Sequence, residues 1–164
     1  MSEFHFVMPT GTTALVGSPI ADFMADGTIT DTVCMSKYKT AYFFIFWADT
    51  TGGTAASTFT VIPIDSVGGT TTTAIPFQWM RVSSTETNTD WAWATSNTMS
   101  ATAGKNQMYV IKVRSDDLPL VTGVKYEYCY VNVAETVNDP ALGGGFIMMA
   151  DPRYDEATLD AVTT

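Results

Sequence analysis

Few residues of this chain have the type and spacing of a catalytic group. The only histidine, His5, lies in an N-terminal stretch that has no clear period, and no acidic partner is fixed beside it. A histidine that transfers protons needs a partner held at hydrogen-bond distance in a cleft. We therefore expect neither a Ser–His–Asp triad nor histidine-based acid–base catalysis.

The acidic residues also lack a catalytic or metal-binding arrangement. Asp116 and Asp117 are adjacent, so in an extended chain their carboxylates point apart, whereas glycosidase carboxylates flank a single bond. They precede Leu118–Pro119, which favours a role in a turn. The spacing of Asp151, Asp155 and Asp160 differs from that of a calcium loop, and the glycine of that loop is missing.

The cysteines and the glycine run do not suggest a cofactor site. Cys34 and Cys129 each lie in a strand-like run, so we expect two buried free thiols, with a cross-strand disulfide as the lesser alternative. No spacing of Cys or His resembles a metal site. Gly143–Gly145 lacks the lysine of a phosphate loop and precedes a strand, which favours a turn or a close backbone approach. We expect no enzymatic activity, no metal and no cofactor.

Tryptophans are the remaining candidates for a binding site. Trp79, Trp91 and Trp93 are close in sequence around a polar loop. Aromatic side chains anchor protein interfaces and form platforms for sugars, and they also fill ordinary sandwich cores. A core role and a protein interface are equally supported. Sugar binding ranks third, because the polar partners that a sugar needs cannot be identified.

Charge limits the choice of partner. The chain has 8 basic and 17 acidic residues, a formal net charge of −9. Such a surface repels phosphate backbones and anionic membranes, so we expect neither a nucleic-acid nor a membrane partner. No apolar run approaches the roughly 18–20 residues that span a bilayer, and Met1–Thr10 lacks the features of a signal peptide. We expect a soluble protein made in a cytoplasm.

The elements that position these residues are predicted to be strands. The 164 residues are enough for one domain, and abundant threonine with 12% aromatics favours β structure. Turn residues separate eight strand-like runs: Thr28–Ser36, Ala41–Trp47, Thr58–Asp65, Ala74–Val82, Asp90–Thr95, Gln107–Arg114, Val124–Val133 and Phe146–Ala150. This pattern predicts an all-β, two-sheet antiparallel β-sandwich with jelly-roll or immunoglobulin-like topology. We expect an extended N-terminal arm (1–27), the sandwich (28–150) and a C-terminal tail (151–164) with one helical turn.

Two of the runs contain a proline. Pro63 and Pro76 each interrupt an otherwise apolar run. Proline cannot donate to a strand ladder, so each predicts an edge position or a bulge. We expect the two runs to pair with each other near a sheet edge.

The run Ala41–Trp47 is apolar on both faces. In a strand, Tyr42, Phe44 and Phe46 point to one side and the intervening residues to the other. A strand on the surface of a monomeric sheet alternates apolar with polar residues, and this one does not. One face is therefore predicted to enter the core and the other to be covered, either by the terminal segments or by a neighbouring subunit. The candidate interface residues are Phe43, Ile45, Trp47, Trp79, Trp91 and Trp93.

A series of strand phrases resembles a family of tailed-bacteriophage head proteins, the decoration or cement proteins. The phrases are TGGT (Thr51–Thr54), TFTVIPIDSV (Thr58–Val67), TTAIPFQWMRV (Thr72–Val82), GKNQMYVIKVRSDDLP (Gly104–Pro119) and PRY (Pro152–Tyr154). With the runs of Val33–Trp47 they extend from Val33 to Tyr154. The segment Asp90–Thr95 and the acidic tail have no counterpart in the resemblance.

The resemblance implies a non-enzymatic virion structural protein. Its expected partner is the major capsid protein, and its expected place is the outer surface of the capsid, after assembly in the host cytoplasm. A homo-oligomer is expected, with a trimer favoured over a dimer because capsids offer local threefold positions. The alternative is a tail, fibre or glycan-binding module that uses Trp79, Trp91 and Trp93.

Overall fold

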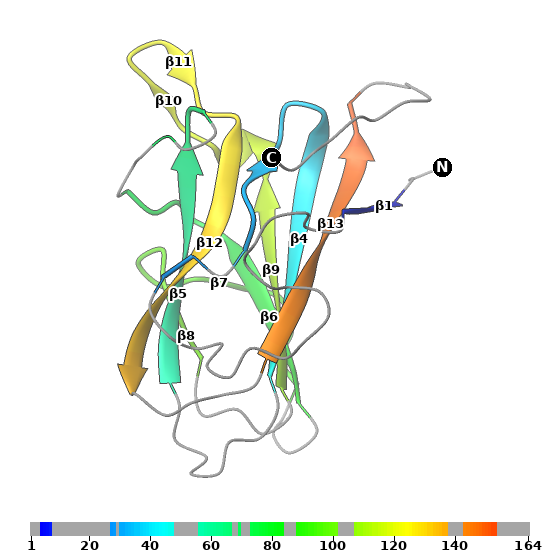
Figure 1. The fold of residues 1–164 in the computed structure, drawn as a ribbon, viewed down its shortest axis with the longest axis vertical. Helices are drawn as coiled ribbons and strands as arrows, with labels where there is room; N and C mark the ends of the chain where they lie inside the picture. Colours follow the sequence, from blue (N-terminus) through cyan, green and yellow to red (C-terminus); the bar gives the residue numbers. More distant parts are fainter. Residues whose placement is uncertain are drawn as a thin grey trace.

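Two antiparallel sheets packed face to face form the body of the protein (Figure 1). The structure is a computed structural model and describes residues 4–7, 27–28, 30–47, 56–66, 69, 73–83, 88–101, 107–137 and 143–153. This architecture confirms the predicted all-β, two-sheet antiparallel sandwich. The described residues include no helix that is long and apolar enough to cross a membrane.

The larger sheet has six strands in the order β1-β13-β4-β9-β6-β7. Its strand β4 lies between β13 and β9 and has partners along both edges. The strands are β1 (Phe4–Val7), β4 (Tyr38–Trp47), β6 (Gln78–Ser83), β7 (Ala92–Trp93), β9 (Gln107–Arg114) and β13 (Gly143–Pro152).

The second sheet has the order β2-β12-β5-β8, and β3 also pairs with β12. Its strands are β2 (Gly27–Thr28), β3 (Val33–Cys34), β5 (Ala56–Ile64), β8 (Met99–Ala101) and β12 (Tyr128–Val137). A separate hairpin, β10 (Leu120–Val121) with β11 (Val124–Lys125), follows the 3-10 turn η1 (Ser115–Asp117). It extends from the upper end of the sandwich (Figure 1).

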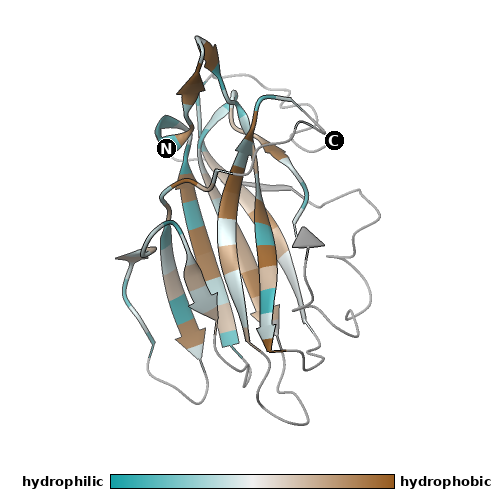
Figure 2. Cartoon of the chain, turned by 90° about the vertical axis from the view of Figure 1, so that its left-hand side faces the viewer, coloured by the Kyte–Doolittle hydropathy of each residue, from teal (hydrophilic) through white to brown (hydrophobic). Residues whose placement is uncertain are grey.

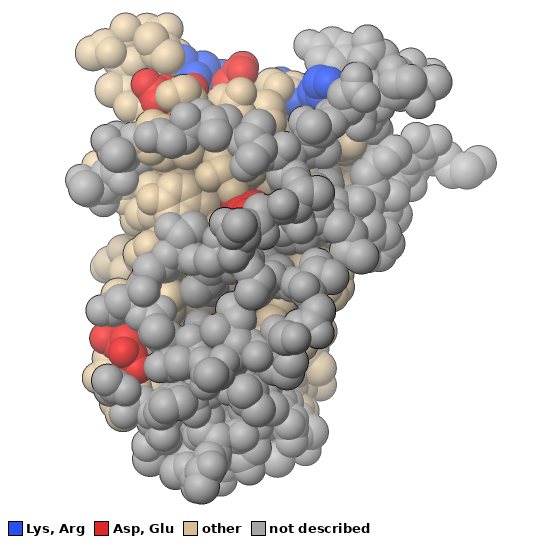
Figure 3. Space-filling view, viewed as in Figure 1, with Lys and Arg blue, Asp and Glu red and all other residues tan. Residues whose placement is uncertain are grey.

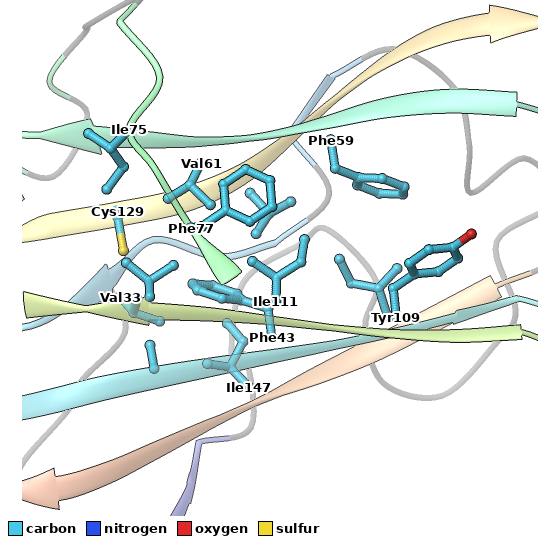
Figure 4. Close-up of a cluster of buried hydrophobic side chains, with 14 of the residues drawn as sticks. Val33, Phe43, Phe59, Val61, Ile75, Phe77, Tyr109, Ile111, Cys129 and Ile147 are labelled. Carbon is cyan, nitrogen blue, oxygen red and sulfur yellow. The ribbon is translucent and has the colours of Figure 1, made fainter. Parts of the chain in front are cut away.

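The core lies between the two sheets. Phe59, Val61 and Cys129 of the five-stranded sheet face Phe43 and Ile111 of the six-stranded sheet, as Figure 4 shows. Each of these five side chains is fully buried. The alternation along β4 and β9 produces this arrangement, because every second residue of a strand points to the same side.

Most predicted strands are present, but the run Thr28–Ser36 is interrupted. Instead of one strand it contributes β2 and β3, two short segments that both pair with β12. Between them the Thr30 hydroxyl oxygen accepts a hydrogen bond of 2.8 Å from the Val131 backbone N–H. A buried side chain thus satisfies one of the amides of β12 at the interruption.

At Pro63 the described residues include no strand paired to the side of β5 that faces away from β12. The Ile75 backbone N–H donates to the Val61 carbonyl (3.1 Å), so the polar groups of Val61 point away from β12, and those of Pro63 point the same way. The missing N–H of Pro63 therefore breaks no ladder bond with β12. The expected pairing between the two proline-containing runs is limited to a single bridge, Val61–Ile75. The rest of the second run is β6, which belongs to the other sheet.

The ends of the chain add strands to both sheets. β1 pairs with β13 at the edge of the six-stranded sheet, and β2 pairs with β12 in the other. The rest of the predicted arm lies outside the described residues, as does the helical turn expected in the tail. Asp151 and Pro152, which we assigned to the tail, instead complete β13.

The glycines of β13 allow a close approach between β13 and β4. A Cβ atom on Gly145 would overlap the backbone carbonyl oxygen of Phe44, whereas a Cβ on Gly144 would meet the Phe46 ring at 3.2 Å. The interpretation of Gly143–Gly145 as a close backbone approach is thus confirmed, within a strand rather than a turn.

Gly145→Ala is predicted to destabilise the fold by about 1–3 kcal/mol, because the backbone of β4 must move. Gly144→Ala is the matched control and should cost less, since the half-exposed Phe46 ring can turn away. Urea unfolding followed by circular dichroism measures both variants. Equal unfolding free energies for the two variants would contradict the close approach at Gly145.

Candidate protein interface on the six-stranded sheet

The side of β4 that points away from the core is aromatic. Tyr42, Phe44 and Phe46 alternate with the buried residues Phe43 and Ile45 and so lie on the outer face of the sheet. Phe46 is 45% exposed, and Tyr42 and Phe44 are half-buried. The strand thus presents three aromatic side chains outward from the middle of the sheet.

The neighbouring strands extend this apolar surface. Phe44 aligns with Phe146 of β13 on one side and with Val110 of β9 on the other. The rings of Phe44 and Phe146 stack with centroids 4.5 Å apart and planes 10° apart. Val110 in turn aligns with Met80 of β6. The outer face of the six-stranded sheet, as we use the term below, comprises Tyr42, Phe44, Phe46, Met80, Val82, Met108, Val110, Phe146 and Met148.

The opposite surface of the sandwich differs. On the five-stranded sheet, Thr58, Thr60 and Asn132 point outward, and the aliphatic Ile62 and Ile64 beside them are only 7% and 2% exposed. Strands seen from this side alternate between hydrophobic and hydrophilic segments (Figure 2). Tyr128 and Tyr130 also point outward there, so the outer side of the five-stranded sheet mixes apolar with polar residues, whereas the described outward rows of β13, β4, β9 and β6 are mostly apolar. Large exposed apolar patches mark binding sites in proteins.

The indole of Trp91 extends over one end of the outer face. Its ring lies 6.2 Å from the ring of Tyr42, and the Nζ atom of Lys112 lies 5.6 Å from its centroid. An ammonium at this distance is attracted by the face of the indole. The three side chains come from β4, β9 and the residue before β7, so the sheet holds them together.

Lys112 is the one charged side chain within these rows of the outer face, among the residues that the structure describes. Arg114, the next outward residue of β9, lies at the end of the sheet and pairs with Asp116 at 3.4 Å. At the same end the Asp151 carboxylate accepts a hydrogen bond from the Thr40 hydroxyl (3.3 Å). Basic and acidic side chains also gather at this end in the view of Figure 3.

This environment changes the pKa of the Tyr42 phenol. Burial raises the pKa of its phenol, and the negative charge of Asp151 raises it further. The phenol therefore stays neutral and remains a hydrogen-bond donor at physiological pH. It provides a polar group at the edge of the aromatic surface.

Two of the predicted interface residues are in the core. Phe43 and Ile45 are 0% and 1% exposed and pack between the sheets, so their assignment to an interface was wrong. The sequence showed two apolar faces on this strand but contained nothing that told which one turned inward. The side of β4 that points away from the core is the one that carries Tyr42, Phe44 and Phe46. The side chain of Trp47 lies outside the described part of the structure.

The three tryptophans separate into two groups. Trp79 packs against the core, with its ring 5.9 Å from that of Tyr109. Trp91 and Trp93 are 43% and 57% exposed. Gln78, the partner of Trp93 across β6 and β7, aligns with Lys112, so Trp93 lies at the border of the outer face. The core alternative therefore holds for Trp79, whereas Trp91 and Trp93 lie outside the core.

The acidic pair considered for catalysis lies in a turn, as the sequence predicts. Asp116 and Asp117 lie in η1, where the Leu118 N–H donates to the Ser115 carbonyl at 3.4 Å. Among the described residues, no three His, Cys, Asp or Glu side chains come together as a metal site would require. His5 lies in β1, and its side chain is outside the description.

The two cysteines lie on adjacent strands but on opposite faces of the sheet. Cys34 is aligned with Tyr128, and Cys129 with Val33, so the two sulfur atoms point to different sides. Both are free thiols; Cys129 is buried and Cys34 only half-buried. The Cys34 sulfur lies 3.0 Å from the Ser36 hydroxyl. The prediction of free thiols is confirmed, although only one of them is fully buried.

Burial raises the pKa of Cys129 from 9.0 to about 12, with a smaller contribution from Cys34. Below pH 9 the thiol is protonated in both the folded and the unfolded state. Above it the unfolded chain ionises first, so we predict that folding stability falls by on the order of 1 kcal/mol between about pH 8 and pH 10 through this group. Cys129→Val should remove that part of the pH dependence, measured by urea unfolding at both pH values. An identical pH dependence in the variant would contradict the prediction.

The hairpin β10–β11 is a second exposed apolar feature, which sequence reasoning missed. Leu120, Val121 and Val124 are 68%, 41% and 53% exposed around a turn with positive φ at Thr122 (49°) and Gly123 (82°). Positive φ at both central residues is typical of the tight hairpin turn that fits the twist of its strands. In the sequence, the pair Thr122–Gly123 between two short apolar runs was the signal that could have predicted this hairpin.

Comparisons with known proteins found no relative of this chain: no family model, no curated protein and no solved structure matches it.

Proposed function

We propose that this chain is a virion structural protein, a decoration or cement protein that binds the outer surface of a bacteriophage head and stabilises its lattice. Its partner is the major capsid protein, it assembles with the capsid in the host cytoplasm, and it acts without catalysis. The proposal joins two arguments. The strand phrases of Val33–Tyr154 resemble that family, and a rigid sandwich with one apolar outer face suits a protein that clamps its neighbours.

The observation that carries the proposal is the outer face of the six-stranded sheet. Four adjacent strands contribute outward aromatic, methionine and valine side chains to it. Aromatic residues and methionine are enriched in the buried centres of protein interfaces. Methionine is also flexible enough to fit an irregular partner surface. A face of this composition supports binding to a large protein surface.

The acidic composition supports the outer side of the shell. A formal charge of −9 disfavours contact with packaged DNA and leaves the exterior as the favourable location. A homo-oligomer, with a trimer favoured, belongs to the same proposal, since local threefold positions on a shell invite threefold binding. Sedimentation velocity of the purified protein tests the oligomer separately.

The direct test is binding to shells assembled from the major capsid protein encoded with this chain. The wild-type protein should co-sediment with expanded shells at a fixed stoichiometry and raise their thermal stability. We predict that Phe46→Glu lowers the affinity by at least about tenfold, because it places a charge within the apolar contact.

Thr60→Glu is the matched control, since it adds the same charge to the outer side of the other sheet. It should bind as the wild type does. If shells do not bind the wild-type protein, the decoration function is wrong. If both variants bind normally, the contact lies elsewhere than on the outer face of the six-stranded sheet.

A glycan-binding role is a second candidate, favoured by the exposure of Trp91 and Trp93. Trp79 does not contribute to such a platform, because it packs on the core. For a glycan binder, Trp93→Ala should abolish retention on a glycan array and leave binding to shells unchanged. For the decoration protein, the wild type should not be retained on the array.

A further inference from the structure

Among the described residues, the outer face of the six-stranded sheet carries one cation, Lys112, in a mostly apolar setting. Lys112 lies between Tyr42 of β4 and Gln78 of β6 across the strands, and Val110 is the neighbouring outward residue on its own strand. It is half-buried, and Trp91 covers it from one side. Among the described residues no carboxylate forms an ion pair with Lys112, unlike Arg114, which is paired with Asp116.

This arrangement has a consequence for any partner that covers the face. Covering it takes the Lys112 ammonium out of water, and the indole of Trp91 compensates only part of the lost hydration. An ammonium buried without a carboxylate is strongly destabilising. The partner must therefore supply an acceptor, most effectively a carboxylate, at the position opposite Lys112.

A second copy of the chain is poorly suited to that position. In a two-fold interface the same face lies on both sides. Centred on Phe44 and Val110, such an interface places each Lys112 near Phe46 and Met108 of the other copy if the two-fold axis runs across the strands, and near the other Lys112 if it runs along them. The described carboxylates near Lys112 lie at the sheet end, where Asp151 is bonded to Thr40 and Asp116 to Arg114. Two ammonium groups would be buried in the contact with no carboxylate partner.

We propose that the outer face of the six-stranded sheet receives a different protein, whose surface is apolar over most of the contact and carries a carboxylate that pairs with Lys112 beside Trp91. This rests on the proposed function and identifies the part of the capsid protein that the face recognises. The apolar rows provide most of the affinity, and the Lys112–Trp91–Tyr42 group selects the register. Charge pairs at protein interfaces commonly fix register and specificity in this way.

The test measures binding of charge variants to the same shells. Lys112→Met keeps the length of the stem and removes the charge, and it should lower the affinity by at least roughly tenfold. Lys112→Glu should lower it further, because it opposes a carboxylate with another. The affinity of the wild type should fall with added salt, and that of Lys112→Met should depend on salt less.

Lys39→Met is the matched control, because Lys39 is an exposed lysine on the adjacent strand β4 and belongs to the opposite alternation. It should bind shells as the wild type does. Thermal unfolding of all variants verifies that each is folded, which is expected because neither lysine is in the core.

The outcomes separate the two proposals. If the wild type binds shells, Phe46→Glu does not and both Lys112 variants bind normally, the carboxylate partner is wrong and the decoration function stands. If wild-type protein self-associates in sedimentation velocity and Lys112→Glu abolishes this, a second copy occupies the face and the inference is overturned. If the wild-type protein does not bind the shells, the decoration function itself is wrong.

Discussion

The two-residue period of β4 is the constraint on which the rest of the structure depends. This strand has hydrogen-bonded neighbours on both edges, and its alternate side chains enter two different environments. One set fills the space between the sheets, and the other forms the aromatic part of the outer face. A shift of register by one residue would exchange the two sets. The backbone contact of Gly145 with Phe44 helps to hold that register.

Because both sets are apolar, the hydrophobic effect alone does not choose between them. The shapes of the side chains and the residues they pack against decide which set points inward. The inward side chains of β4 pack against the apolar side chains of β5 and β12, such as Phe59 and Val131. The outward side chains pack sideways against β13 and β9 instead, so that Val110 is only 4% exposed on a surface without a second layer in the described structure. Of the residues that make up this face, only Phe46 is exposed; Val110 is buried and the others are half-buried.

Much of the fold could be predicted from the sequence, and the limits are physical. The alternation in Gln107–Arg114 predicts β9 with its bounds, because a half-buried strand carries its period in its residues. The interruption at Thr30 carries no such signal, since a side-chain hydroxyl there replaces part of a ladder bond. The crossing of the chain from β5 to β6 was also missed. A proline marks a break in pairing but does not say to which sheet the chain goes next.

The sequence predicts which kinds of residue form the candidate site, but it does not predict where in the fold they lie. The run Ala41–Trp47 shows that an apolar face needs cover, and Trp91 and Trp93 show that aromatic groups lie nearby. Which face turns outward depends on residues far away in sequence, such as Met80 and Phe146, which complete it. The cation–π contact of Lys112 with Trp91 joins β9 to the segment before β7, and no local pattern encodes such a contact.

The path of the chain between the sheets affects how the protein forms. From β4 onward the strands alternate between the sheets: β4 to β5, β5 to β6, β7 to β8, β8 to β9 and β12 to β13. Strands of one sheet are therefore separated in sequence by strands of the other, and most pairings close long loops. Chains with such non-local pairing fold slowly, within milliseconds to seconds. During that interval the aromatic rows of both faces are open to the solvent together. The same surface that suits a partner in the finished protein is then an aggregation hazard during synthesis, and the excess of acidic residues, through mutual repulsion, keeps the unfinished chains apart.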